Sequence, residues 1–216
     1  MPSLRTRSIA VFNRTELLVV IAGVMVGLAI ILPVLARSQA RSSKIGCPQS
    51  LKQIGLAFRT WAIDNNDRFP MQLSVTNDGT LELVSSGRVF PHFLVMSNEL
   101  STPKILACPT DTDRTYATSF AHGLADTNLS YFINVDAVQG NDSVVLCGDR
   151  NLKNQPPAGS RFVSLSSSSV IGWNSEMHRR RGNLCFTDGS VRGFLNGAVA
   201  STVRIPAGVT NRLAVP

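Results

Sequence analysis

The sequence of 216 residues has few charged residues, few aromatic residues and few histidines. Charged residues make up 16% of the chain, aromatic residues make up 6%, and there are 3 histidines. The charged fraction lies below the roughly 25% that is usual for soluble domains, which argues against a charge-rich disordered chain. The 4 cysteines form no CxxC pair, and no serine or cysteine lies in a recognisable nucleophile motif. We therefore do not expect an enzyme.

The positive charge is distributed unevenly. The net charge is +7, and residues 1–60 hold eight cations and one anion, whereas residues 61–216 hold 13 of each. The excess therefore lies around one N-terminal segment, and the bulk of the chain is neutral. Arg179, Arg180 and Arg181 form the one dense basic run in the neutral part. A DNA contact there is a minor hypothesis, and we do not expect a nucleic acid as a partner.

Residues 17–35 are apolar throughout and carry no charge. As a helix this run would span about 28 Å, close to the ~30 Å hydrocarbon core of a bilayer. A soluble helix of this length would normally carry a polar stripe, and none is present. We predict a transmembrane helix at residues 12–36, preceded by a leader at 1–11. It could be a retained anchor, or a secretory signal cleaved after Ala36 that releases a secreted enzyme.

The start of this helix carries a distinctive pattern. Residues 12–22 read FNRTELLVVIA, with Phe12, then Glu16 four residues later, and Pro33 late in the apolar run. The segment resembles the N-terminus of type IV pilins and type II secretion pseudopilins. The resemblance implies a kink at Pro33, cleavage before Phe12 by a prepilin peptidase, and methylation of the new amine. It also implies that Glu16 pairs inside the membrane with that amine of a neighbouring subunit, since an unpaired carboxylate is costly there.

Local helix chemistry offers a second interpretation of Glu16. Asn13 and Glu16 have the spacing of a capping box, and an anion in the first turn is favoured by the helix dipole. Capping and assembly are compatible roles for one carboxylate. Two positions differ from the family pattern: Val11 stands where the family has Gly, and Arg14 stands where it has an apolar residue.

Residues 37–66 are predicted to continue the helix outside the membrane. Apolar residues recur there at helical intervals and share one face. They are Cys47, Leu51, Ile54, Phe58 and Trp61. We predict that this face packs on a sheet.

The remaining residues, 67–216, are predicted to form a globular domain with an irregular first part. Short strands are expected at 129–135, 143–147, 183–187 and 190–195. The last two flank Asp188–Gly189, which is a strong hairpin signal. The predicted fold class is α+β, with a long N-terminal helix packed on a small antiparallel sheet.

A second resemblance lies in this domain. His178, nine intervening residues and then Asp188–Gly189 are similar to the motif of a processing-associated domain in pseudopilin-like proteins of planctomycete and verrucomicrobial type. His178 with Asp188 and Asp149 could bind a divalent ion or perform acid–base chemistry. The favoured interpretation is structural, with Asp188–Gly189 as a turn and His178 packed beside it.

No cofactor is expected, although calcium is a secondary hypothesis. The acidic loops at Asp136 and Asp142, or at Asp111 and Asp113, are its candidate ligands, and their spacing matches no EF-hand.

The four cysteines allow three disulfide pairings. Cys47 and Cys108 resemble positions that are commonly Cys in the family, and this resemblance implies a Cys47–Cys108 bond. Cys147 and Cys185 each lie in a predicted strand, and we predict a second bond between them. The alternative is that these two are small buried apolar residues.

Taken together, these features predict a structural pseudopilin subunit of a type II secretion or type IV pilus-like filament. It would lie in the bacterial inner membrane as a single-pass protein, with a cytoplasmic N-terminus and a periplasmic domain. By resemblance its partners are copies of itself or other pseudopilins, the prepilin peptidase and an assembly platform. The alternative is a monomeric membrane-anchored domain that binds a ligand or metal outside the cytoplasm.

Overall fold

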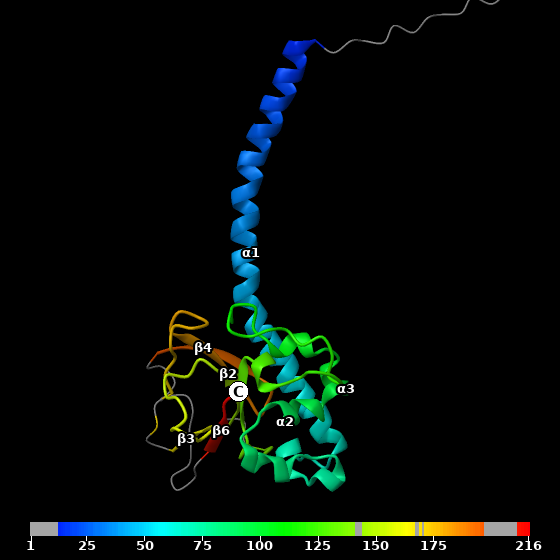
Figure 1. Ribbon diagram of the computed structural model, residues 1–216, viewed down its shortest axis with the longest axis vertical. Helices are drawn as coiled ribbons and strands as arrows, with labels where there is room; N and C mark the ends of the chain where they lie inside the picture. The colour runs from blue at the N-terminus through cyan, green and yellow to red at the C-terminus, as the bar shows by residue number, and fades with distance from the viewer. Residues whose placement is uncertain (1–12, 141–143, 167–168, 170, 197–210) are drawn as a thin grey trace, which may run out of the picture. The chain divides into compact units, whose positions relative to one another are not determined.

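The computed structural model describes residues 13–140, 144–166, 169, 171–196 and 211–216, and within this part the side chains of residues 34–45 are not described (Figure 1). The predicted leader, Phe12 and Asp142 lie outside the described residues. The chain divides into two compact units, residues 1–42 and residues 43–216. The sequence predicts domain boundaries at residues 36 and 66.

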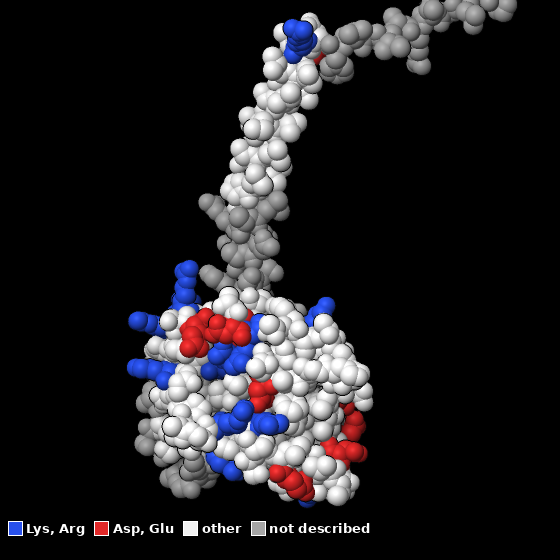
Figure 2. Space-filling model, viewed as in Figure 1, with Lys and Arg blue, Asp and Glu red and all other residues white. Residues whose placement is uncertain are grey.

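The first unit contains the N-terminal part of helix α1 (Arg14–Asp64). At its start the Glu16 carboxylate accepts a hydrogen bond from the Asn13 backbone N–H at 3.2 Å, as the capping interpretation predicts. Residues Arg14–Pro33 form the one described helix that is long and apolar enough to cross a membrane, and none of this segment is buried. Figure 2 shows this segment without charge beyond its N-terminal end. Pro33 lies inside α1, and the kink expected there stays a prediction.

The second unit contains the rest of α1, which runs without a break through Gly46 and Pro48 to Asp64. All five residues of the predicted apolar face are buried, with exposed fractions of 5% or less. The predicted packing face is therefore confirmed. The helix ends where Asn66 and Asp67 both adopt positive φ, a conformation that cannot continue a right-handed helix.

A six-stranded antiparallel sheet forms the centre of this unit, in the order β3-β6-β1-β2-β4-β5. The strands are β1 (Tyr131–Asn134), β2 (Val145–Asp149), β3 (Phe162–Leu165), β4 (Arg181–Phe186), β5 (Val191–Leu195) and β6 (Asn211–Ala214). Four of them lie where the sequence predicts strands, whereas β3 and β6 were not predicted. The α+β class and the long N-terminal helix agree with the prediction.

Each face of the sheet is covered by a separate apolar cluster. Tyr131 and Ile133 point to the cluster that contains α1, whereas Phe132 between them points to the opposite cluster. This alternation follows from the two-residue period of a strand. The opposite cluster is built around Trp173 and the loop before β4. The central strands β1 and β2 are thus buried along their whole length, whereas the edge strand β5 is mostly exposed.

The α1 face of the sheet is also covered by the segment predicted to be irregular. This segment consists of short helices: η1 (Pro70–Gln72), η2 (Val75–Asn77), η3 (Leu81–Ser86), α2 (Phe90–Leu94), α3 (Ser97–Leu100) and η4 (Pro103–Leu106), with η5 (Asp126–Asn128) following later. Phe93 of α2 lies 6.1 Å from Phe58 of α1 between ring centroids. His92 is fully buried beside it, and its Nδ1 lies 2.7 Å from the Thr80 hydroxyl. Burial lowers the pKa of His92 to about 4.

Helix α1 packs closely against the sheet at Gly55. A Cβ at this position would lie 2.5 Å from Cys185 Sγ on β4 and 3.6 Å from the Gly189 Cα. Only a residue without a side chain fits at this crossing.

Candidate functional site

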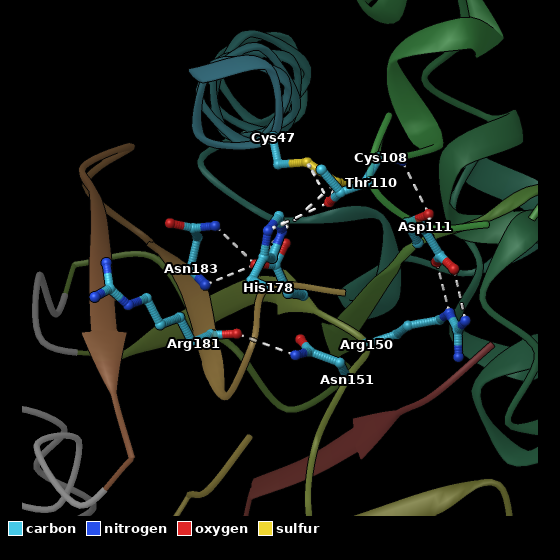
Figure 3. Close-up of a disulfide and its surroundings, with 11 residues drawn as sticks. Cys47, Cys108, Thr110, Asp111, Arg150, Asn151, His178, Arg181 and Asn183 are labelled. Carbon is cyan, nitrogen blue, oxygen red and sulfur yellow. Dashed lines mark hydrogen bonds and ion pairs between the residues drawn. A yellow bond between two sulfur atoms is a disulfide. The ribbon is translucent and has the colours of Figure 1, made fainter. Parts of the chain in front are cut away.

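A disulfide links α1 to the loop that follows η4. It joins Cys47 to Cys108 across 61 positions of sequence, as the resemblance implies, and both cysteines are buried. Thr110 lies beside this bond, with its hydroxyl 3.1 Å from Cys108 Sγ. The disulfide therefore fixes α1 against the loop that carries Cys108 and Thr110 (Figure 3).

His178 lies against this disulfide from the loop that precedes β4. Its Nε2 is 3.6 Å from Cys108 Sγ, and its Nδ1 is 3.3 Å from the Thr110 hydroxyl. The next two residues, Arg179 and Arg180, have φ of 52° and 65°. This left-handed backbone costs non-glycine residues roughly 1–2 kcal/mol each, so the fold holds the loop against local strain to place the imidazole here.

Asp149, at the end of β2, is the second polar group of the cluster. Its Oδ2 lies 3.3 Å from His178 Nε2 and accepts hydrogen bonds from the backbone N–H and side-chain Nδ2 of Asn183, at 2.8 and 2.7 Å. The side chain is fully buried, and Oδ1 has no hydrogen-bond partner among the described residues. Burial raises the pKa of Asp149 to about 7, although the two bonds from Asn183 act in the opposite direction.

Burial also lowers the pKa of His178. Both partners are thus shifted toward their neutral forms, even though their separation is that of an ion pair. We therefore do not describe this contact as a full ion pair near neutral pH, where an Asp149 carboxyl with a pKa of about 7 is only partly ionised. When Asp149 is ionised, an Nε2–H tautomer of His178 donates to its Oδ2, and the Thr110 hydroxyl can then donate to Nδ1.

A strong ion pair lies next to this cluster. Arg150 donates from Nε and NH2 to both oxygens of the Asp111 carboxylate, each at 2.7 Å. Burial acts to raise the pKa of Asp111, but the hydrogen bonds from Arg150 and Ser130 outweigh it and hold this pKa below its ordinary value. Arg150 also lies 3.1 Å from Asp113 and 3.4 Å from Glu176. The Arg150 guanidinium therefore already neutralises the Asp111 carboxylate and donates a hydrogen bond to each of its oxygens.

The Asp136 carboxylate is also paired with an arginine. Both of its oxygens accept hydrogen bonds from Arg212, with the shortest at 2.6 Å. Because Asp142 lies outside the described residues, the calcium hypothesis for this pair stays a prediction. Among the described residues, Asp111 and Asp136 each face an arginine.

The two ends of the predicted family motif lie at opposite ends of β4. His178 precedes the strand, whereas Asp188 and Gly189 follow it in the turn to β5. Gly189 has φ of 79°, and the Asp188 carbonyl accepts a hydrogen bond from Arg59 of α1 at 2.6 Å. The turn interpretation of Asp188–Gly189 is confirmed. The structure does not bring His178 and Asp188 together, and the carboxylate beside His178 is Asp149.

Cys147 and Cys185 are free and buried, so the predicted second disulfide is wrong. They lie directly opposite each other on β2 and β4. Burial raises the pKa of the Cys147 thiol well above its ordinary value, which disfavours the thiolate that disulfide formation requires. The alternative interpretation, small apolar residues beneath α1, describes them correctly.

The basic run is placed on the surface. Arg179, Arg180 and Arg181 are exposed, and the Arg181 side chain points away from His178 (Figure 3). On the face drawn in Figure 2, blue and red side chains of the globular unit are interspersed. The DNA hypothesis stays a minor prediction.

Sequence reasoning did not predict two members of the cluster, Thr110 and Asn183. Thr110 follows Cys108 by two residues, and this proximity to a predicted disulfide is the signal that could have indicated it. The chain matches no protein-family model, no curated protein and no solved structure.

Proposed function

We propose that this chain is a structural, non-enzymatic pseudopilin subunit of a type II secretion or type IV pilus-like filament, inserted in the inner membrane before assembly. The observation that carries the proposal is the segment Arg14–Pro33, which has no charge after Glu16 and no buried part among the described residues. A helix of this kind requires lipid or other apolar helices around it.

The resemblance of residues 12–22 to pilin N-termini supports a helical neighbour in addition to lipid. Glu16 is the one acidic residue of the first sixty, and it lies in the first turn of α1. In an assembled filament its carboxylate pairs with the N-terminal amine of an adjacent subunit and sets the register between helices. The globular unit then faces the periplasm.

The N-terminal residue and the mass of the mature chain test the first part of this proposal. Cleavage before Phe12, with or without a methyl group on the new amine, supports the pseudopilin. A mature chain that begins at Arg37 contradicts it and identifies a secreted protein. An intact Met1 indicates a plain anchor and also contradicts processing.

Two substitutions of Glu16 test the second part, because they separate assembly from helix capping. Glu16→Gln keeps an oxygen that can accept the hydrogen bond from Asn13, but it removes the charge. Glu16→Ala removes both. If charge pairing drives assembly, both variants insert in the membrane and neither forms cross-linked oligomers. If Glu16→Gln assembles like the wild type, capping is the role of Glu16 and the assembly proposal is refuted.

The second candidate function is a monomeric membrane-anchored domain that binds a ligand or metal outside the cytoplasm. The observation that favours it is the cluster of His178 and Asp149, in which one buried carboxylate oxygen has no hydrogen-bond partner among the described residues. In this case the wild-type chain would insert in the membrane and remain monomeric in the same cross-linking assay. Both Glu16 variants would then behave like the wild type.

A further inference from the structure

The disulfide and its neighbours contain the donor set of a metal site. Cys47 Sγ, Cys108 Sγ and one ring nitrogen of His178 all lie within 4.8 Å of one another. We propose that the reduced form of this chain binds a zinc ion through these three side chains. The fourth coordination position then lies beside the Asp149 carboxylate. This proposal does not depend on filament assembly.

Two observed separations fit tetrahedral zinc. Zinc binds sulfur at about 2.3 Å and nitrogen or oxygen at about 2.0–2.2 Å, so a tetrahedral site places S and N about 3.6 Å apart and N and O about 3.4 Å apart. His178 Nε2 lies 3.6 Å from Cys108 Sγ and 3.3 Å from Asp149 Oδ2. The imidazole therefore already has the spacing of a ligand toward both neighbours.

The groups behind these atoms are those that orient metal ligands. With Nε2 on the metal, His178 Nδ1–H donates to the Thr110 hydroxyl, which lies 3.3 Å away. Asn183 donates two hydrogen bonds to Asp149 Oδ2, while the buried Oδ1 has no partner among the described residues. Hydrogen bonds from such outer groups fix the orientation of ligands at zinc sites.

Zinc binding and the disulfide exclude each other, because the metal binds thiolates and not disulfide sulfur. A dithiol or phosphine reductant supplies two electrons, and the S–S bond breaks to give two thiols. Zinc then displaces two protons and forms two Zn–S bonds. The reduced form is the state in which every chain is synthesised, since a disulfide forms only by later oxidation. Bound zinc would hold α1 on the loop after η4 before that oxidation takes place.

The experiment uses the full-length chain in detergent, with zinc ion alone as the probe. One sample keeps its disulfide, and the other is reduced with a phosphine and stripped with a chelator that is then removed. We expect one zinc per chain in the reduced sample only, measured by competition with a chromophoric chelator. Zinc should also raise the melting temperature of the reduced sample and leave that of the oxidised sample unchanged. Equal binding by both samples, or no binding by the reduced one, overturns the proposal.

Substitutions then identify the ligands. His178→Gln should weaken zinc binding at least tenfold, and Asp149→Asn by about 10–100-fold. His122→Gln, which alters an exposed histidine, and Cys147→Ala are the matched controls and should bind as the wild type does. All variants are first shown to fold by tryptophan fluorescence, with the disulfide intact in every variant except Cys47→Ser, which cannot form it. Cobalt in place of zinc gives a direct readout, because thiolate-to-cobalt charge-transfer bands report cobalt–sulfur bonds. Loss of these bands in Cys147→Ala but not in Cys47→Ser would place the metal elsewhere and refute the assignment.

Discussion

The crossing of α1 over β4 makes a sharp prediction for Gly55→Ala. The added Cβ would lie 2.5 Å from Cys185 Sγ, about an ångström or more inside the roughly 3.5–4.0 Å at which non-bonded heavy atoms rest. The Gly189 backbone lies 3.6 Å away, so the helix cannot simply slide past the sulfur. Overpacking of this kind costs about 1–3 kcal/mol, and we expect the upper end because both residues are buried. Alanine returns about 1 kcal/mol through helix propensity, which leaves a net loss of about 2 kcal/mol.

The background Cys185→Ala should reverse the sign of this effect. Without the sulfur, the methyl group added at position 55 fills the vacated space, and the helix-propensity gain of about 1 kcal/mol remains. The coupling between the two positions is therefore expected to be about 3 kcal/mol, at the upper end for residues in contact. The assay is urea denaturation of the full-length chain in detergent, followed by fluorescence of Trp61 and Trp173. Both tryptophans are buried in the globular unit. An equal cost of Gly55→Ala in the two backgrounds would refute the helix-on-sheet contact.

Three further predictions use the same denaturation assay. Replacing both Cys47 and Cys108 by Ala, with a chelator present, should lower the free energy of unfolding by up to about 4 kcal/mol. The bond closes a loop of 61 positions, and closing a loop of that length stabilises a fold by about this much. A loss below about 1 kcal/mol would contradict this prediction. The pKa of His92 is about 4 in the folded chain against 6.5 unfolded, so the stability present above pH 6.5 should fall as the pH drops toward 4, by up to about 3 kcal/mol. His92→Gln should remove this part of the pH dependence, and an unchanged slope would show that another group causes it. Gly182→Ala would place a Cβ against the Trp173 ring. We expect the free energy of unfolding to fall by about 1–3 kcal/mol and the tryptophan emission to shift to the red. An unshifted emission spectrum would count against this packing.

Local patterns in the sequence predicted the elements that depend on periodicity. The apolar residues of α1 recur at helical spacing, and the structure buries all five that were named. The turn at Asp188–Gly189 was predictable because glycine accepts the positive φ that the hairpin requires. The strands β3 and β6 were not predicted. β6 has only four residues, one of them Arg212, and its place in the sheet depends on partners far away in the chain.

The pairing of side chains was less predictable than the elements that carry them. Cys47–Cys108 was expected from resemblance alone, since nothing in their spacing selects one of the three pairings. The same sequence suggested a bond between Cys147 and Cys185, and the structure contains two free thiols there. All four cysteines are buried, so burial alone does not separate the bonded pair from the free pair. The pairing depends on how the packed elements place the sulfur atoms, which is not visible along the chain.

The sequence by itself determined that this chain has one uncharged apolar helix near its N-terminus and an α+β part after it whose residues 61–216 carry no net charge. Hydrophobic length and periodicity are local properties, so they can be counted without a structure. Only the tertiary structure decided that His178 faces Asp149 and the Cys47–Cys108 bond, while Asp188 lies at the other end of β4. A strand rises by about 3.3 Å per residue, so residues at its two ends lie far apart. Side chains from a helix, a loop and two strands, in contrast, meet where those elements pack together. The chemistry of the cluster therefore arises from contacts between elements that no single stretch of sequence contains.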